Sequence, residues 1–336
     1  MHIITHPHLQ SLYGAKLTRR LRNEGFQVSF ATFPAGEHCK NISIVQSLYT
    51  SCAKEKLRRN SVIIALGGGV VGDVAGFVAA TYLRGIKFVN VPTTLLAMVD
   101  SAIGGKTGVD LPQGKNLVGA FHQPTLVWCD LSLLKTLPPR EWKTGMAEIV
   151  KYGVIKDAGF FGFLEKLFKN GTPCPLPPKA LLHMVERSAA IKAEVVAKDE
   201  FETKGLRQIL NFGHTTAHAL EASTSYKSLT HGEAVSVGMC AAGRIAVRLG
   251  LFNKQELVRL ENLLIHIGLP TLTPVRAFGR RFWEAMAQDK KIEREEFRFV
   301  LPAKIGRVIV RDISKAVVAK ALSPHPDPLP HRERGL

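Results

Sequence analysis

The amino-acid sequence predicts an α/β domain with a parallel sheet, followed by a mostly α-helical domain. Three observations support this prediction. Up to about residue 140, short apolar runs rich in β-branched residues alternate with helical patterns, as in layered α/β domains. These runs are apolar at nearly every position, which is typical of strands covered by helices on both faces. After about Pro138 the apolar residues recur instead with the 3.6-residue period of helices.

The elements follow from these patterns in chain order. The expected strands are 2–5, 27–33, 61–66, 87–91 and 125–129, and the expected helices are 74–83, 146–155, 179–198, 211–221 and 233–249. The proline-rich segment 170–178 cannot be helical in its interior. The tail 323–336 holds four prolines and few apolar residues, so we expect it to be disordered. We therefore expect one domain over 1–140, a second over 141–322, and a disordered tail.

Composition excludes several classes of protein. The 336 residues suit two domains, and 46% apolar residues are enough for a sizeable core. The five cysteines form no Cys-x-x-Cys pair, which indicates reduced thiols in a cytosolic protein rather than a disulfide scaffold. We expect no signal peptide and no membrane span. The net charge of +17 is scattered and no nucleic-acid recognition motif is visible, which favours sites for small anions over nucleic-acid binding.

A glycine-rich turn follows the third expected strand. Gly67, Gly69 and Gly72 match the Gly-x-Gly-x-x-Gly pattern, which lets a backbone approach a pyrophosphate at a helix N-terminus. No acidic residue lies about 20 positions downstream to bind a ribose, as the usual dinucleotide fingerprint requires. A tightly packed turn between strand and helix therefore stays open as the alternative.

Further groups suited to anions follow the fourth expected strand. Thr93 and Thr94 lie at its carboxyl end, where open α/β sheets bind ligands. We expect loops at 104–108 and 114–116, each of which presents a lysine beside glycine. The spacing does not match the phosphate-binding loop of NTPases.

A carboxylate and three histidines are candidates for a metal site. His214 and His218 lie one helical turn apart, His231 begins another expected helix, and Glu148 could supply a third ligand. On spacing alone, an ordinary pair of surface or core histidines stays open. Lys151 shares a helical face with Glu148, and the two could equally form a surface ion pair.

Taken together, these residues resemble the 3-dehydroquinate synthase family, the sugar-phosphate cyclases of the shikimate pathway. The resemblance runs from about Phe33 to Ala321. The segments that carry it are 34–37, 67–73, 91–96, 99–107, 114–116, 137–141, 211–214 and 231–234.

The resemblance implies a Rossmann-like NAD-binding domain, a helical domain, and an active site in the cleft between them. It implies a cytoplasmic homodimeric lyase of aromatic amino-acid and chorismate biosynthesis. Such an enzyme converts 3-deoxy-D-arabino-heptulosonate 7-phosphate to 3-dehydroquinate and phosphate. The steps are transient oxidation by NAD, β-elimination of phosphate, reduction, and intramolecular aldol cyclisation. Because the departing phosphate can itself act as the base, no conspicuous protein base is required.

The resemblance also assigns roles to individual residues. A zinc or cobalt ion would be held by Glu148, His214 and His231. The residues expected at the reacting groups are Lys106, Lys151, Lys192, Arg207, Asn211 and His218. Further substrate contacts would come from Asp100, Asn116, Lys290 or Lys291, and Arg84, which the family brings in across a dimer. The expected NAD contacts are Glu37, Lys40, Gly69, Val70, Val71, Gly72, Asp73, Thr93, Thr94, Lys106, Lys115, Leu133, Leu134, Lys135 and Thr136.

The sequence departs from the family pattern in three places. Relatives usually begin earlier, with a β-rich segment, and they carry Asp or Asn where this chain has His6-Pro7-His8. The segment 202–207 carries one extra residue. Three alternatives stay open: a cyclase of the 2-deoxy-scyllo-inosose synthase type, a metal-dependent alcohol or glycerol dehydrogenase, and an inactive truncated relative.

Overall fold

A computed structural model describes residues 1–172, 176–224, 229–272, 278–288 and 296–322. The chain forms two compact units, each made of two stretches of sequence. The first unit holds residues 1–149 and 176–206, and the second holds 150–175 and the chain from 207 onward. Helix α7 (Pro178–Lys198) therefore groups with the N-terminal sheet, although helices on both sides of it in the chain belong to the second unit.

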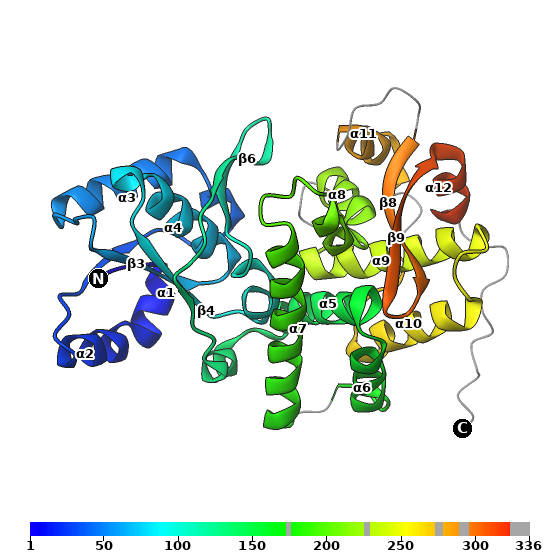
Figure 1. The fold of residues 1–336 in the computed structure, drawn as a ribbon, viewed down its shortest axis with the longest axis horizontal. Coiled ribbons are helices and arrows are strands. Elements are labelled where there is room, and N and C mark those ends of the chain that lie inside the picture. Colours follow the sequence, from blue (N-terminus) through cyan, green and yellow to red (C-terminus); the bar gives the residue numbers. More distant parts are fainter. Residues whose placement is uncertain (173–175, 225–228, 273–277, 289–295, 323–336) are drawn as a thin grey trace. The chain divides into compact units, whose positions relative to one another are not determined.

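The first unit is built on a five-stranded parallel sheet (Figure 1). Its strands, in the order β2-β1-β3-β4-β7, are β2 (Ser29–Thr32), β1 (His2–Thr5), β3 (Val62–Gly67), β4 (Lys87–Pro92) and β7 (Leu126–Val127). Successive residues of β1, Ile3 and Ile4, are both fully buried, and they belong to core clusters on opposite faces. Two-sided burial explains why the central strands β1 and β3 are mostly apolar, and the predicted parallel sheet is confirmed.

The helices of the first unit begin and end at recognisable signals. They are α1 (Pro7–Leu9), α2 (Ala15–Asn23), α3 (Ile42–Lys54), α4 (Gly69–Thr81) and α7, with shorter turns η1 (Gln10–Gly14), η2 (Glu37–Cys39), η3 (Tyr82–Arg84), η4 (Ala97–Ser101) and η5 (Leu131–Thr136). The side chain of Asn41 caps α3 by accepting a hydrogen bond from the backbone N–H of Ile44. Helix α4 begins at Gly69, inside the glycine pattern and five residues before the expected start at 74.

The two lysine-bearing loops were predicted wrongly, because both segments belong to an antiparallel hairpin. Strand β5 (Lys106–Leu111) pairs with β6 (Gly114–Phe121). The backbones approach so closely that a Cβ on Gly119 would lie 2.2 Å from the carbonyl oxygen of Thr107. Glycines at Gly108 and Gly119 replace the alternating side chains that normally identify a strand, so the pattern resembled a loop.

The second unit is mainly helical, as predicted. Its helices are α6 (Ala158–Phe168), α8 (His214–Ser223), α9 (His231–Arg248), α10 (Lys254–Ile267), α11 (Arg280–Gln288) and α12 (Lys315–Leu322), with the 3₁₀ turn η6 (Leu206–Asn211). Helix α5 (Pro139–Lys156) runs from the first unit into the second. One hairpin that the sequence analysis did not predict, β8 (Glu296–Lys304) with β9 (Arg307–Ser314), completes the unit.

Several expectations fall partly or wholly outside the described residues. The tail 323–336 does so, as do residues 173–175 of the proline-rich segment; α7 begins at Pro178, directly after that segment. Cys39, Cys52, Cys129 and Cys240 are free thiols, and Cys174 is not described. Among the described helices, none combines the length and apolar character needed to cross a membrane.

The fully buried His2 predicts a pH dependence of stability. Its Nδ1 lies 2.8 Å from Ser29 Oγ, and burial lowers the pKa of His2 from 6.5 to about 4. The unfolded chain therefore binds a proton more readily, so this stabilisation is complete above about pH 6.5 and is lost as the pH falls towards 4. The contribution amounts to about 1 kcal/mol between about pH 7.5 and 5.5.

Urea unfolding at these two pH values measures the effect. The variant His2→Asn should lose about 1 kcal/mol of the pH dependence. The control His8→Asn, at an exposed histidine, should keep all of it. Equal pH dependence in the wild type and His2→Asn would contradict this account.

Candidate metal centre and ligand-binding residues

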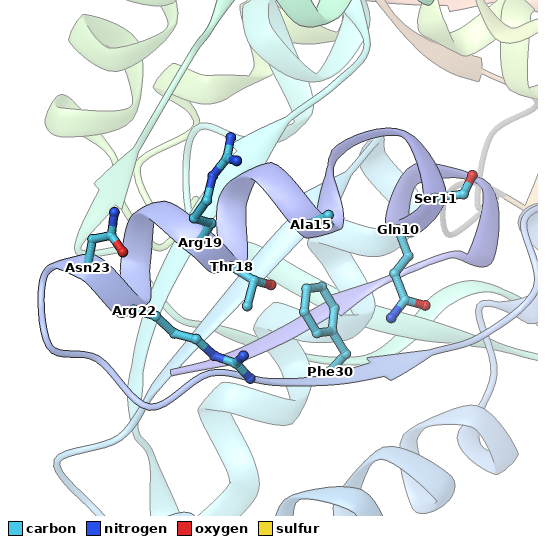
Figure 2. Close-up of a pocket in the computed structure, with 9 residues that line it drawn as sticks. Gln10, Ser11, Ala15, Thr18, Arg19, Arg22, Asn23 and Phe30 are labelled. Carbon is cyan, nitrogen blue, oxygen red and sulfur yellow. The ribbon is translucent and has the colours of Figure 1, made fainter.

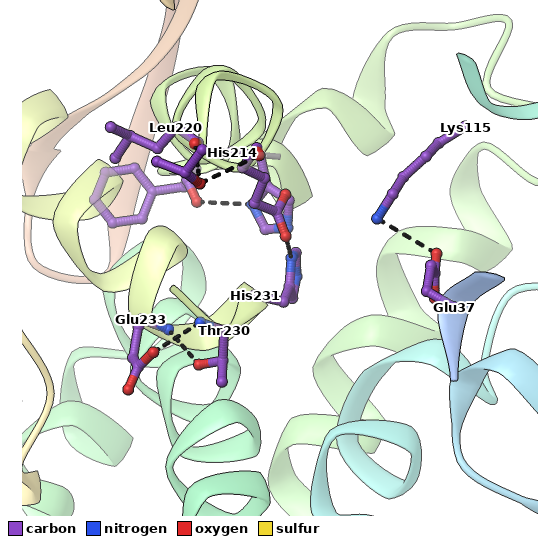
Figure 3. A network of polar contacts seen from close by, with 10 residues as sticks. Glu37, Lys115, His214, Leu220, Thr230, His231 and Glu233 are labelled. Atoms are coloured by element: carbon purple, nitrogen blue, oxygen red, sulfur yellow. Dashed lines mark hydrogen bonds and ion pairs between the residues drawn. The ribbon is translucent and has the colours of Figure 1, made fainter. Parts of the chain in front are cut away.

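One carboxylate and two imidazoles lie close enough together to hold a metal ion. Glu148 lies on α5, His214 is the first residue of α8 and His231 is the first residue of α9. One ligand atom of each lies within 4.8 Å of the others. The two imidazole rings approach edge to face, with centroids 5.4 Å apart (Figure 3).

Local sequence features make His214 and His231 the first residues of their helices. Thr230 caps α9 in a reciprocal arrangement: its hydroxyl accepts from the N–H of Glu233, whose carboxylate accepts from the N–H of Thr230 (Figure 3). Gly213, with φ of +82°, supplies the left-handed turn before α8. Each imidazole is thus fixed at a helix start rather than on a loop.

A backbone contact between two glycines sets the separation of these helices. A Cβ on Gly238, in the middle of α9, would lie 1.9 Å from the carbonyl oxygen of Gly213. No side chain fits there, so α8 and α9 pack at backbone distance. His214 follows Gly213 directly, and His231 lies two helical turns before Gly238, so this contact brings the imidazoles together.

Hydrogen bonds to Nδ1 leave Nε2 of both imidazoles available as ligand atoms. His214 Nδ1 lies 3.2 Å from the carbonyl oxygen of Phe212, and His231 Nδ1 lies 3.3 Å from Glu221 Oε1. A carbonyl and a carboxylate only accept, so each Nδ1 carries the proton and each Nε2 carries the lone pair. Two neutral imidazoles and one carboxylate match the ligand set of a catalytic zinc or cobalt site.

The other expected substrate residues of the second unit differ in exposure. Arg207, on η6, and Lys151, on α5, are buried, and the Lys151 ammonium lies 4.9 Å from the ring centroid of Tyr152. Asn211 and His218 are exposed, and the rings of His218 and His214 lie 5.5 Å apart. His218 is therefore close to a candidate metal ligand without being part of the ligand group.

In the first unit, two expected substrate-binding lysines are paired with acids. Lys192, on α7, donates to the carbonyl oxygen of Asp100 at 2.7 Å and lies 2.9 Å from its carboxylate. Lys106, at the start of β5, pairs with Glu202, whose backbone φ is +58°. Phe201 next to it packs edge to face on Phe121 of β6, which holds this segment against the hairpin.

The glycine turn has features that suit a pyrophosphate. Helix α4 starts at Gly69, and its cap, Gly68, has no side chain to occupy the first free N–H groups. The carbonyl of Gly67 accepts from the N–H of Thr93 at 2.9 Å, which joins the turn to the end of β4. Packing also excludes a side chain at the start of this turn, because a Cβ on Gly67 would lie 2.5 Å from Cβ of Val71.

Expected NAD-binding residues from three separate elements meet beside this turn. Lys40 Nζ donates to Asp73 Oδ2 and to Asn116 Oδ1, each at 2.5 Å, and Lys115 lies 3.4 Å from Glu37 (Figure 3). Burial by itself lowers the pKa of Lys40, but the charge of Asp73 and its hydrogen bond outweigh burial and raise it. The buried lysine therefore stays protonated.

The remaining expected residues are less tightly placed. Arg84 is exposed on a turn in which Leu83, Arg84 and Gly85 all have positive φ. On η5, Leu133 and Leu134 are buried, whereas Lys135 and Thr136 are exposed, and Thr136 Oγ1 lies 2.6 Å from the hydroxyl of Tyr13. Lys290 and Lys291 lie outside the described residues.

A separate open pocket lies along α2 and the edge strand β2 (Figure 2). It has a volume of about 660 Å³ and is lined by Gln10, Ser11, Gly14, Ala15, Thr18, Arg19, Arg22, Asn23 and Phe30. It contains none of the residues expected to bind the metal, NAD or substrate. This pocket is therefore separate from the candidate functional residues.

Sequence reasoning missed two acids at the site. Glu221 follows His214 by seven residues, two helical turns on the same face, so that spacing could have identified it. Glu202 lies 96 residues from Lys106, and no local pattern indicates their contact.

Both parts of the chain match known proteins. A family model described as 3-dehydroquinate synthase N-terminal matches residues 30–144, and one described as 3-dehydroquinate synthase C-terminal matches 145–292. The chain is 51% identical over 310 residues to a 3-dehydroquinate synthase of Synechococcus sp., covering 92% of this chain and 84% of the relative. It is 47% identical over 323 residues to that of Picosynechococcus sp., covering 96% and 88%.

Solved structures of cyclases have the same fold. The 2-epi-5-epi-valiolone synthase of Streptomyces hygroscopicus subsp. jinggangensis, with NAD⁺ and Zn²⁺ bound, matches with a TM-score of 0.87 and 29% identity. A 2-deoxy-scyllo-inosose synthase complexed with carbaglucose-6-phosphate, NAD⁺ and Co²⁺ matches with a TM-score of 0.85 and 28% identity. Both alignments cover 96% of this chain and 89% of the other. A probable glycerol dehydrogenase of Sinorhizobium meliloti, at 16% identity, covers 96% of this chain and 94% of its own; with a TM-score of 0.61 it shares the fold alone.

The glycine contact between α8 and α9 predicts a sensitive position. Gly238→Ala should force the helices apart, lower the free energy of unfolding by about 1–3 kcal/mol and weaken zinc binding. Gly162→Ala on α6, where a Cβ meets nothing within 4 Å, should leave both unchanged or slightly raise stability. Thermal unfolding and zinc titration measure the two effects, and wild-type behaviour of Gly238→Ala would contradict the proposed contact.

Proposed function

Because the chain belongs to the 3-dehydroquinate synthase family, we propose that it is a carbon-oxygen lyase that acts on 3-deoxy-D-arabino-heptulosonate 7-phosphate. Its products are 3-dehydroquinate and phosphate. The observation that carries the proposal is the convergence of Glu148, His214 and His231 in a chain whose sequence matches both family domains. We expect the enzyme to act in the cytoplasm.

The proposed metal ligands come from three different helices. Glu148 supplies a buried carboxylate from α5, and His214 and His231 supply Nε2 atoms from two helix starts. A divalent ion bound there would polarise substrate hydroxyl and carbonyl oxygens. His218, exposed beside His214, is placed to hydrogen-bond substrate, so we assign it a positioning role rather than that of a general base.

The cofactor residues would bind NAD through backbone and charge together. The first N–H groups of α4 face the position expected for the pyrophosphate, and the buried Lys40–Asp73 pair fixes the polar surface beside it. Glu37 is proposed to accept from a ribose hydroxyl, the role for which no residue lies downstream of the glycine turn. NAD supplies a hydride acceptor that returns the hydride within each turnover.

The substrate residues are suited to a ligand that carries both a carboxylate and a phosphate. Lys106, Lys151, Lys192 and Arg207 are four cations whose placement is set by helices, a strand and a 3₁₀ turn. Asp100, Asn116 and Asn211 add hydrogen-bonding groups for substrate hydroxyls. We propose that positioning and electrostatics supply most of the rate, since the departing phosphate can remove the adjacent proton itself.

Arg84 is proposed to act in a homodimer by reaching the partner's site. Its exposed turn, with three successive positive φ angles, holds the side chain away from its own sheet core. The Arg84→Ala variant should therefore keep its fold and its NAD binding while losing phosphate release.

A coupled assay tests the proposed reaction directly. Purified protein with NAD and zinc or cobalt should release phosphate from the heptulosonate substrate without net accumulation of NADH. Steady growth of the NADH absorbance would indicate a dehydrogenase instead. Preference for glucose 6-phosphate would indicate a 2-deoxy-scyllo-inosose synthase, and NAD binding without phosphate release would indicate an inactive relative.

Glu148→Gln tests the metal centre that the reaction needs. Replacing the carboxylate with a neutral amide removes the only anionic ligand of the group, so bound zinc and phosphate release should both fall at least about tenfold. Glu186→Gln, at an exposed acid on α7, is the control and should change neither. Metal analysis and phosphate assays on the same preparations decide, and normal values for Glu148→Gln would refute the ligand role.

A further inference from the structure

Glu221 contacts a metal ligand without belonging to the ligand group. It lies near the end of α8, and its side chain is only 10% exposed. Its Oε1 lies 3.3 Å from Nδ1 of His231, whereas the proposed ligand atom is Nε2 of the same ring. A carboxylate is rarely buried without a task, because its desolvation must be compensated by charge or hydrogen bonds.

The two candidate imidazole ligands are held differently on their outer side. Nδ1 of His214 donates to the backbone carbonyl of Phe212, a partner that no side-chain substitution can remove. Nδ1 of His231 instead donates to a side chain, Glu221, which comes from the neighbouring helix. The backbone therefore holds the outer nitrogen of one imidazole, and a carboxylate side chain holds that of the other.

The position of Glu221 on α8 makes this contact possible. It lies two helical turns after His214 on the same face, and α8 packs on α9 at the Gly213–Gly238 contact. A single helix thus supplies one ligand directly and supports a second ligand from across the helix pair.

From this geometry we propose that Glu221 is a positioning residue for the metal centre. It holds His231 in the Nδ1-protonated form, fixes the ring plane, and directs the Nε2 lone pair to the ion. This role rests on the proposed metal site and deepens it. A hydrogen-bonded carboxylate also makes the imidazole a stronger donor, and loss of such a partner typically weakens metal binding about 10–100-fold.

Zinc affinity measured by chelator competition on the metal-free protein tests the proposal without any turnover. Glu221→Ala should bind zinc about 10–100-fold more weakly. Glu221→Gln keeps an acceptor oxygen and should fall between Ala and wild type. With cobalt in place of zinc, the visible absorption of Glu221→Ala should shift, because the orientation of one ligand has changed.

A second buried acid provides the matched control. Glu261, on α10, is also only 10% exposed as a side chain, and it pairs with Arg244 at 2.5 Å. Glu261→Gln should alter thermal unfolding but leave zinc affinity and the cobalt spectrum at wild-type values. This control separates loss of a buried ion pair in general from loss of support for His231.

The outcomes distinguish the positioning role from the metal site itself. Wild-type zinc affinity and an unchanged cobalt spectrum in Glu221→Ala would overturn the positioning role, as would a Gln variant that binds as weakly as Ala. If Glu148→Gln loses zinc while Glu221→Ala does not, only this inference fails. If Glu148→Gln also binds zinc normally, the proposed metal site fails with it.

Discussion

The close backbone contact between Gly213 and Gly238 is the constraint on which the candidate metal centre depends. A helix pair with side chains at this crossing would be wider, and two imidazoles at its helix starts could not share an ion. The contact places His214 one residue from the crossing and His231 two turns from it. Capping by Thr230 and the left-handed turn at Gly213 then define the first residue of each helix. The two candidate imidazole ligands therefore lie at the starts of helices rather than on loops.

The parallel sheet brings together the residues that are expected to bind NAD. In-register pairing of β3 with β4 puts Gly67 beside Pro92, so the glycine turn and Thr93 leave the sheet at the same edge. Hairpin β5–β6 brings Asn116 to Lys40, and the backbone N–H of Asn116 is held in turn by Asp110 at 2.8 Å. Residues that are far apart in the sequence lie close together because these strands end at the same edge of the sheet.

The sequence predicts some of these features well and others poorly, for physical reasons. Strands β1 and β3 are buried on both faces, so their composition alone identifies them. Hairpin β5–β6 was missed because glycines replace its alternating side chains, whereas β8 does alternate, with Phe297 and Phe299 buried around Arg298, and could have been found. The ligand group was indicated by the family resemblance, while spacing alone left it open. Glu202 could not be foreseen, because its contact with Lys106 depends on tertiary structure.

Ion pairing explains how a strongly basic chain can hold the lysines that are expected to bind anions in defined positions. Lys40, Lys106, Lys115 and Lys192 each have an acid partner in the first unit. The buried pairs Lys40–Asp73 and Lys192–Asp100 are costly to separate, so they hold their geometry whether or not a ligand is bound. The Lys106 side chain is 55% exposed in its pair with Glu202, and a solvated pair contributes little net stability. Lys106 can therefore exchange its partner for an anion at a lower cost than Lys40 or Lys192, whose pairs are buried.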